Sequence, residues 1–204
     1  MRRATITRLS VAAVGGLLLA GVAGAAAAEE LIGDSNDVDV TVQIAQLHEP
    51  GILALSVADS STVLAENGST AAVRRFTGTL PTVTVTDTRT AGEIPDGAFW
   101  YVNGTASSLV GDTGQPEIAA DHLGWSPHLL TPNAGEVSEG PQVDTVLDAP
   151  PNNVGLEGAE LLAMAESSEE AVGVWQAAAD LVLKVPVTVA PGTYTSVVTL
   201  SLFE

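Results

Sequence analysis

The stretch GAFWYVNG, residues 97–104, places Phe99, Trp100 and Tyr101 side by side in a chain that has eight aromatic residues. In a β-strand, successive side chains point to opposite faces, so Trp100 shares one face with Val102 while Phe99 and Tyr101 share the other. The indole is the largest of these apolar surfaces and costs the most free energy when it is left in water. We therefore predict that Trp100 and Val102 face the core of a β-sheet protein.

The opposite face of this strand is a candidate binding surface. Phe99 and Tyr101 would form a small platform beside Asn103, and rings of this kind stack on sugars because their faces are apolar and polarisable. The alternative is that a neighbouring loop covers both rings, because exposed rings are a liability in a free monomer. The candidate binding residues are Phe99, Trp100, Tyr101, Asn103 and Trp125, although Trp125 in LGWSP is also expected to anchor its loop by burying its indole.

Several other short segments predict β-strands, because they alternate apolar and polar residues or are rich in β-branched residues. Val83 and Val85 fall on one face, and Pro50-Gly51 predicts a hairpin between the first two segments. Residues 156–166 are compatible with a helix by composition, and ELLAMAES, residues 160–167, is compatible with a strand, which we favour. The predicted strands are residues 37–45, 52–57, a short one within 61–70 with a turn at Asn67-Gly68, then 72–80, 82–89, 99–102, 160–166, 172–189 and a long terminal strand over 193–203.

Many short strands without a convincing long helix predict an all-β fold, an antiparallel β-sandwich of the Ig-like or jelly-roll-like type. Residues 103–153 are rich in Gly, Pro, Asn, Asp and Ser, which predicts a long irregular loop region. Short strands are conceivable there near Leu109 and in QVDTVL, residues 142–147. The last strand could pair within its own sheet or present an edge to another subunit.

The first residues have the pattern of a secretory signal peptide: a basic start, an apolar stretch, and small residues before Glu29. We assign residues 1–28 to a signal peptide and residues 29–204 to a single β-sandwich domain, which predicts a secreted or cell-surface protein. A membrane anchor is the alternative, but the apolar stretch is glycine-rich and falls short of the ~20 strongly apolar residues that a spanning helix needs. No membrane span is expected in the mature chain.

The charge of the mature chain excludes one class of partner. Without residues 1–28, four Lys and Arg residues face 25 Asp and Glu residues, which gives a net charge of −21. A field of this sign repels phosphate backbones, so we expect no nucleic-acid binding. The chain contains no Cys, so a packed core must stabilise it without disulfides.

The order of several motifs resembles the WxL-domain surface proteins of Gram-positive bacteria. TLPTVTVTDTR, FWYVNG, LGWSP and the final APGTYTSVVTLSLF follow one another over about residues 76–204. Trp100-Tyr101-Val102 stands at the family's first Trp-x-Leu motif, with Val in place of Leu. Leu200-Ser201-Leu202 stands at the second motif, with Leu in place of Trp. The resemblance implies non-covalent attachment to peptidoglycan and association with partner surface proteins.

Two polar clusters are candidates for chemical sites. ADHLGWSPH brings Asp121, His122, Ser126 and His128 together, but Ser126 lacks a Gly-x-Ser-x-Gly elbow and a linear cluster is not a triad, so we interpret it as a polar loop. DSNDVDV, residues 34–40, offers oxygen ligands suited to calcium but departs from the EF-hand pattern. We interpret it as a solvated acidic surface, and expect no metal site and no cofactor.

Together these patterns predict a non-enzymatic surface protein that associates with the cell wall or with partner surface proteins. The alternative is a structural subunit of a surface fibre or layer that assembles by β-strand pairing. A secreted hydrolase that uses the 121–128 cluster is a weaker third hypothesis. Neither the glycan, the partner nor the assembly state follows from the sequence.

Overall fold

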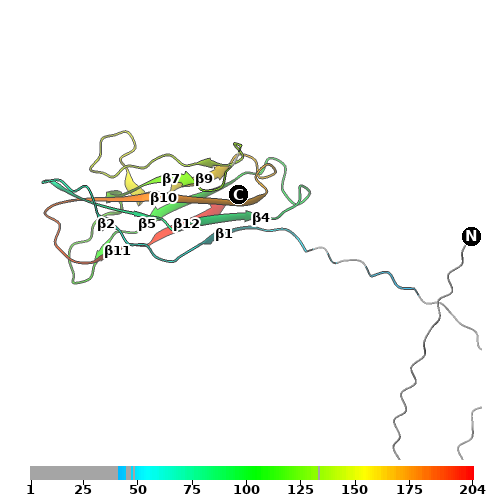
Figure 1. The fold of residues 1–204 in the computed structure, drawn as a ribbon, viewed down its shortest axis with the longest axis horizontal. Helices are drawn as coiled ribbons and strands as arrows, with labels where there is room; N and C mark the ends of the chain where they lie inside the picture. Colours follow the sequence, from blue (N-terminus) through cyan, green and yellow to red (C-terminus); the bar gives the residue numbers. More distant parts are fainter. Residues whose placement is uncertain (1–40, 45–46, 48, 133) are drawn as a thin grey trace, which may run out of the picture. The chain divides into compact units, whose positions relative to one another are not determined.

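The computed structural model describes residues 41–44, 47, 49–132 and 134–204, and Figure 1 shows the arrangement of their strands. The described part is all-β, as predicted, with two short 3-10 helices, η1 (Ala120–His122) and η2 (Gly155–Glu157). Neither helix has the length or apolar character that crossing a membrane requires, and the described residues form no other helix. The strands are β1 (Leu53–Val57), β2 (Ala65–Glu66), β3 (Val73–Thr79), β4 (Val83–Asp87), β5 (Trp100–Ala106), β6 (Val110–Gly111), β7 (Leu123–Leu129), β8 (Ser138–Glu139), β9 (Glu160–Ala165), β10 (Gly173–Pro186), β11 (Tyr194–Thr195) and β12 (Val198–Phe203).

The first sheet is organised around the long strand β10. Strands β4 and β3 pair antiparallel with its first and second halves, and β7 pairs with its middle. Residues 80–82 separate β3 from β4 and belong to neither strand. Within this break, Leu80 keeps one hydrogen bond to β10, from its backbone NH to the carbonyl of Ala179 at 2.8 Å. On the outer side, β1 pairs with β4 and β2 pairs with β3.

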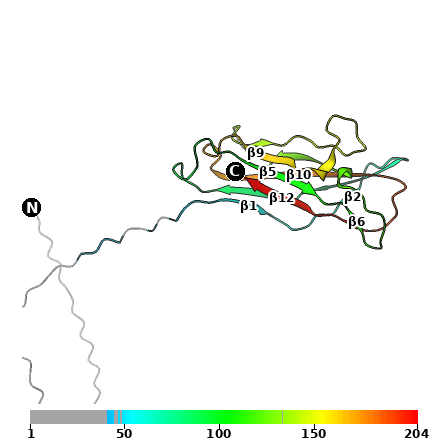
Figure 2. The ribbon, with the colours of Figure 1, turned by 180° about the vertical axis from the view of Figure 1, so that it is seen from behind.

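The second sheet has the order β12-β5-β9-β8, with all neighbours antiparallel. Strand β12 is therefore an edge strand, and Figures 1 and 2 show it next to β5. A bulge between Val102 and Asn103 shifts the pairing of β5 with β9. Strands β6 and β11 form a separate two-stranded ribbon.

The two sheets pack face to face on one apolar core, and the chain itself closes one side of the sandwich. Gly140 donates to the carbonyl of Leu162 in the second sheet, and Val143 exchanges backbone hydrogen bonds with Trp125 in the first. On the opposite side, edge strands β1 and β12 lie next to each other without pairing. The sandwich is thus a partly closed, curled structure that is open along the β1–β12 side.

The expected strands are largely confirmed, including the strand over residues 160–166 and the shared buried face of Val83 and Val85. The turn at Asn67-Gly68 is also confirmed, because Gly68 has a φ of 77° and Asn67 bonds to Arg75.

Five expectations are wrong. The segment 121–128, interpreted as a polar loop, contains part of η1 and most of strand β7, which pairs with β10. Residues 41–44 form no strand, and the other residues of the 37–45 segment lie outside the described residues. Strand β1 pairs with β4, and not with the preceding segment in the hairpin expected at Pro50-Gly51. The segment 142–147 makes only an isolated bridge, at Val143. The terminal strand divides into β11 and β12, because side-chain hydroxyls replace backbone partners at the junction. The hydroxyl of Ser107 accepts from the backbone NH of Val197, and the hydroxyl of Ser196 donates to the carbonyl of Ser107.

Candidate functional site

Three aromatic rings lie in a row on the outer face of the second sheet. Tyr101 on β5 pairs in register with Phe203 on β12, and Phe99 lies two residues before Tyr101 on the same face. The ring centroids of Phe99 and Tyr101 are 6.1 Å apart, and those of Tyr101 and Phe203 are 5.1 Å apart. We call Phe99, Tyr101 and Phe203 the aromatic row.

The geometry of the aromatic row decides which ring surfaces a partner can reach. The ring planes lie within 20° of each other, so at these distances neighbouring rings stack face to face with an offset. The outer rings remain accessible, since Phe99 is 46% exposed and Phe203 is 44% exposed, while Tyr101 is half-buried between them. The row therefore offers ring edges and outer ring faces, rather than one flat sheet of three open rings.

Sequence reasoning identified Phe99, Tyr101 and Asn103 but missed Phe203. Asn103 lies beside the row on β5, opposite Ser201 of β12. The signal for Phe203 was present in the alternation of VTLSLF, residues 198–203, but it became useful only once β12 was known to pair with β5.

The structure places the other two candidate binding residues in the core. Trp100 is 0% exposed and Trp125 is 1% exposed, so the prediction that Trp100 and Val102 face inward is confirmed. Neither indole NH finds an acceptor among the described residues, which means that both rings act there through packing. A ligand outside the sandwich cannot touch either ring.

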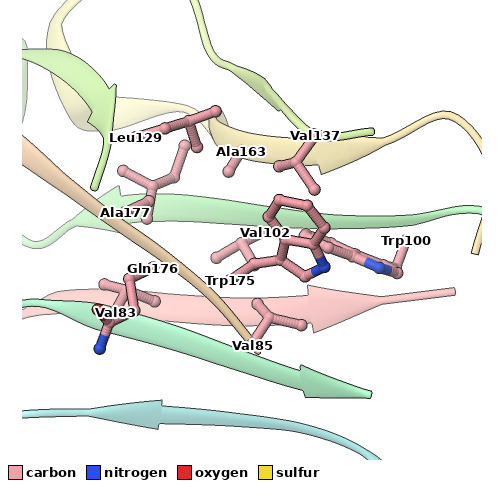
Figure 3. A pocket seen from close by; sticks show the side chains of 11 residues that line it. Val83, Val85, Trp100, Val102, Leu129, Val137, Ala163, Trp175, Gln176 and Ala177 are labelled. Carbon is pink, nitrogen blue, oxygen red and sulfur yellow. The ribbon is translucent and has the colours of Figure 1, made fainter. Parts of the chain in front are cut away.

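A small cavity lies between the sheets, lined by apolar side chains from both and by Gln176 (Figure 3). Its volume is about 10 Å³, which is at the lower limit for one water molecule. Trp100 and Val102 line it from β5, and Trp175 lines it from β10. The indole NH of Trp175 donates to the carbonyl of Ala171 at 2.7 Å, so this polar group is already satisfied. A cavity of this size and lining cannot hold a substrate.

An ion cluster joins the two sheets close to the aromatic row. Arg89 donates two side-chain hydrogen bonds to the buried carboxylate of Asp87, at 2.9 and 2.7 Å, and also contacts Glu204 at 2.8 Å. The hydroxyl of Ser168 donates to Glu204 at 3.2 Å. Burial raises the pKa of Asp87, but the hydrogen bonds from Arg89 outweigh this effect and the net pKa is lowered. The same contacts raise the pKa of Arg89, so the cluster is held charged.

The polar cluster at 121–128 is divided between different environments. His122 lies in η1, and its Nδ1 is 2.6 Å from the carbonyl oxygen of Lys184. Ser126 and His128 lie on β7, opposite Asp180 and Ala178 of β10. Lys184 forms an ion pair with Asp148, whose carboxylate also accepts from the hydroxyl of Thr145. His122 is thus engaged in a contact that ties η1 to β10.

The acidic segment over residues 34–39 lies outside the described residues. The described residues contain no group of three or more His, Asp or Glu side chains placed to hold a metal ion. Comparison of the chain with family models, with curated proteins and with solved structures finds no match.

Proposed function

We propose that this protein is a secreted, non-enzymatic surface protein that associates non-covalently with cell-wall peptidoglycan or with a partner surface protein. The signal-peptide pattern of residues 1–28 supports export, and the WxL-like order of motifs supports a surface role. The observation that carries the proposal is the exposed aromatic row of Phe99, Tyr101 and Phe203.

The aromatic row lies in a part of the chain that is free of charge. Residues 97–111 and 185–203 contain no Asp, Glu, Lys or Arg, although the whole chain carries a net charge of −18. Aromatic side chains contribute much of the binding energy at protein interfaces, because they bury a large apolar area. Strands β5 and β12 themselves carry no charge, so a surface that meets them desolvates few carboxylates of this acidic protein.

Sedimentation with purified peptidoglycan tests the proposal. We expect the protein to cosediment, and the double variant Phe99→Ala/Phe203→Ala to lose most of the bound fraction while it keeps its thermal unfolding temperature within a few degrees. Val174→Ala is the matched control, because Val174 is also exposed, at 55%, but lies on β10 of the other sheet.

If the protein does not cosediment at any salt concentration, peptidoglycan is not its ligand, and the same variants are tested against the extracellular surface proteins of its source. Equal loss of binding in the Val174 and Phe99/Phe203 variants would contradict a role for the aromatic row. Trp100→Ala is unsuitable as a binding variant, because Trp100 is fully buried and its removal perturbs the fold.

Two features support a role without catalysis. The cavity between the sheets accommodates no substrate, and His122 is held by a backbone carbonyl rather than by Ser126. A His122→Gln variant is expected to keep its binding to peptidoglycan or partner. Any hydrolytic activity that disappears with this variant would contradict the proposal.

A second candidate function is assembly into a surface fibre or layer by β-strand pairing. The uncharged edge strand β12 favours it, because an unprotected edge offers its backbone groups to another strand. Size-exclusion chromatography over a concentration series tests this candidate, and a strict monomer would remove it.

A further inference from the structure

Strand β12 has one free hydrogen-bonding edge. It pairs with β5 on one side, and no described strand pairs with it on the other. The carbonyl of Val197 accepts from Ser107, so by the antiparallel alternation residues 199, 201 and 203 face β5 with their NH and CO groups. The NH and CO groups of Val198, Leu200 and Leu202 therefore point away from β5, towards the side where β1 lies next to β12 without pairing with it.

The β12 edge lacks the features that usually protect such edges from pairing. Proteins block exposed edges with charged side chains, proline, bulges or very short strands. Strand β12 is six residues long, and residues 187–203 contain no charged side chain and only one proline, Pro191 in the turn before it. Three other described edges differ: β2 and β8 have two residues each, and β7 contains Pro127 and is bridged by Val143. Edge strand β1 (Leu53–Val57) is also uncharged, but it is one residue shorter than β12.

We propose that two copies of this chain form a dimer in which β12 pairs antiparallel with β12 of the second copy, Leu200 lying opposite Leu200. The inference rests on the second proposed function, assembly by strand pairing, and specifies its partner and symmetry. In this register Val198 lies opposite Leu202 of the second copy, so the three residues with free NH and CO groups bond to their counterparts.

The side chains of β12 are complementary to themselves in this register. On the inner face, Val198, Leu200 and Leu202 pack against the core and would continue an apolar row into the second copy. On the outer face, Phe203 would lie opposite Val197 of the second copy, and Thr199 opposite Ser201. Val197 is 63% exposed and Phe203 is 44% exposed, so the pairing covers an exposed apolar side chain at each end.

A second copy fits this edge better than a charged partner does, because every residue that meets across it is uncharged. Two copies of the mature chain, each with a net charge of −21, repel elsewhere, so the neutral edge is the place where they approach with the least repulsion. The contact is isologous, since the same strand serves both copies, and an isologous contact closes at two subunits. This edge therefore yields a dimer with a continuous eight-stranded sheet, not an open fibre.

Analytical ultracentrifugation over a concentration and salt series tests the dimer, with two charge-matched variants. Ser201→Lys places a like charge in both copies beside the proposed contact. Ser138→Lys makes the same change on the outer face at the opposite edge of the same sheet, since Ser138 pairs with Met164, the neighbour of Tyr101. We expect a monomer–dimer equilibrium that salt strengthens, and a dissociation constant raised about tenfold or more by Ser201→Lys but little by Ser138→Lys.

Backbone amide hydrogen exchange on the unmodified protein gives a second, residue-specific readout. The amides of Val198, Leu200 and Leu202 are expected to exchange fast in dilute protein. They should become protected as the protein concentration, and with it the fraction of dimer, rises. The amides of Thr199 and Ser201 bond to β5, so they should be protected at every concentration and act as an internal reference.

The outcomes separate the inference from the proposal on which it rests. A monomer at all concentrations, with the three edge amides always unprotected, overturns both the dimer and assembly by strand pairing. Species that grow beyond two subunits overturn the two-fold contact but support a fibre. A dimer that both Lys variants weaken equally, or that leaves the edge amides unprotected, forms through another surface and overturns the inference.

Discussion

Gly104 on β5 lies directly against the indole of Trp125 on β7, and the two residues belong to opposite sheets. A Cβ atom on Gly104 would be 2.5 Å from Cη2 and 2.8 Å from Cζ3 of Trp125. Glycine in the middle of a strand usually weakens it, so a close approach of this kind accounts for its presence. This contact sets the distance between the two sheets at this point, because the backbone of β5 packs directly on the indole of Trp125.

We predict that Gly104→Ala lowers the free energy of unfolding by about 1–3 kcal/mol, because it overpacks the core. Trp125→Phe removes the atoms that the new methyl group would meet, at the cost of a cavity. The two changes together should therefore be less destabilising than the sum of the single changes, as measured by urea unfolding. Strict additivity would contradict the steric explanation.

Local alternation predicted most of the sheet content but not the strand partners. FWYV placed Trp100 and Val102 inside and Phe99 and Tyr101 outside, because the two-residue period of a strand needs only four neighbouring residues. The same pattern over residues 37–45 predicted a strand, yet residues 41–44 form none. A strand forms only where another strand offers hydrogen bonds and a face to bury, and the pattern alone does not say whether one is present.

The candidate site shows the same limit. Phe203 completes the aromatic row only through the register of β12 with β5, over about a hundred residues of sequence. Asp87 and Arg89 are two residues apart in TDTR, so their pairing was accessible to sequence reasoning, but the contact of Arg89 with Glu204 depends on the packing of two sheets. The sequence therefore predicts which face a residue occupies better than which residues meet there.

The ion cluster predicts a large loss of stability on removal of its cation. Arg89→Gln leaves the carboxylate of Asp87, with a fully buried side chain, without its partner. Breaking one partner of a buried pair costs roughly 3–5 kcal/mol, which chemical denaturation measures directly. Arg74→Gln is the matched control, because the Arg74–Glu66 pair at 2.8 Å is well exposed to solvent and should contribute little. Equal effects of the two variants would contradict the role of burial.

The same cluster predicts how the loss of unfolding free energy caused by Arg89→Gln depends on pH. The folded pKa of Asp87 is lowered from its ordinary value of 3.8, so its ionisation stabilises the fold above that value and the contribution is lost as pH falls through the folded pKa. In Arg89→Gln the backbone NH of residue 89 still donates to Asp87, but burial is the larger effect, so it raises the pKa of Asp87 and favours the protonated form.

The stability difference between the unmodified protein and Arg89→Gln should therefore be largest near neutral pH. It should shrink as the pH falls, first where the variant's carboxylate takes up a proton above the ordinary pKa of 3.8, and further as Asp87 of the unmodified protein is protonated below that value. Thermal unfolding of both proteins from pH 7 to pH 3 measures this difference. Arg89→Gln in an Asp87→Asn background provides the control, because neither Asp87→Asn nor Arg89→Gln/Asp87→Asn has a carboxylate at position 87, and the stability difference between these two proteins should show no narrowing from this residue. A difference that stays constant with pH would rule out Asp87 as the titrating group.

The aromatic row predicts energetic coupling across the β5–β12 pair. Tyr101 and Phe203 stack at 5.1 Å with planes 19° apart, a geometry that contributes about 0.5–1.5 kcal/mol beyond the burial of area. A double-mutant cycle with Tyr101→Leu and Phe203→Leu isolates this term, since leucine keeps an apolar side chain at each position. Asn103 and Ser201, the next pair on the same face, supply the control cycle and should couple more weakly. Equal coupling in both cycles would mean that strand pairing, rather than ring stacking, holds β12 to its neighbour.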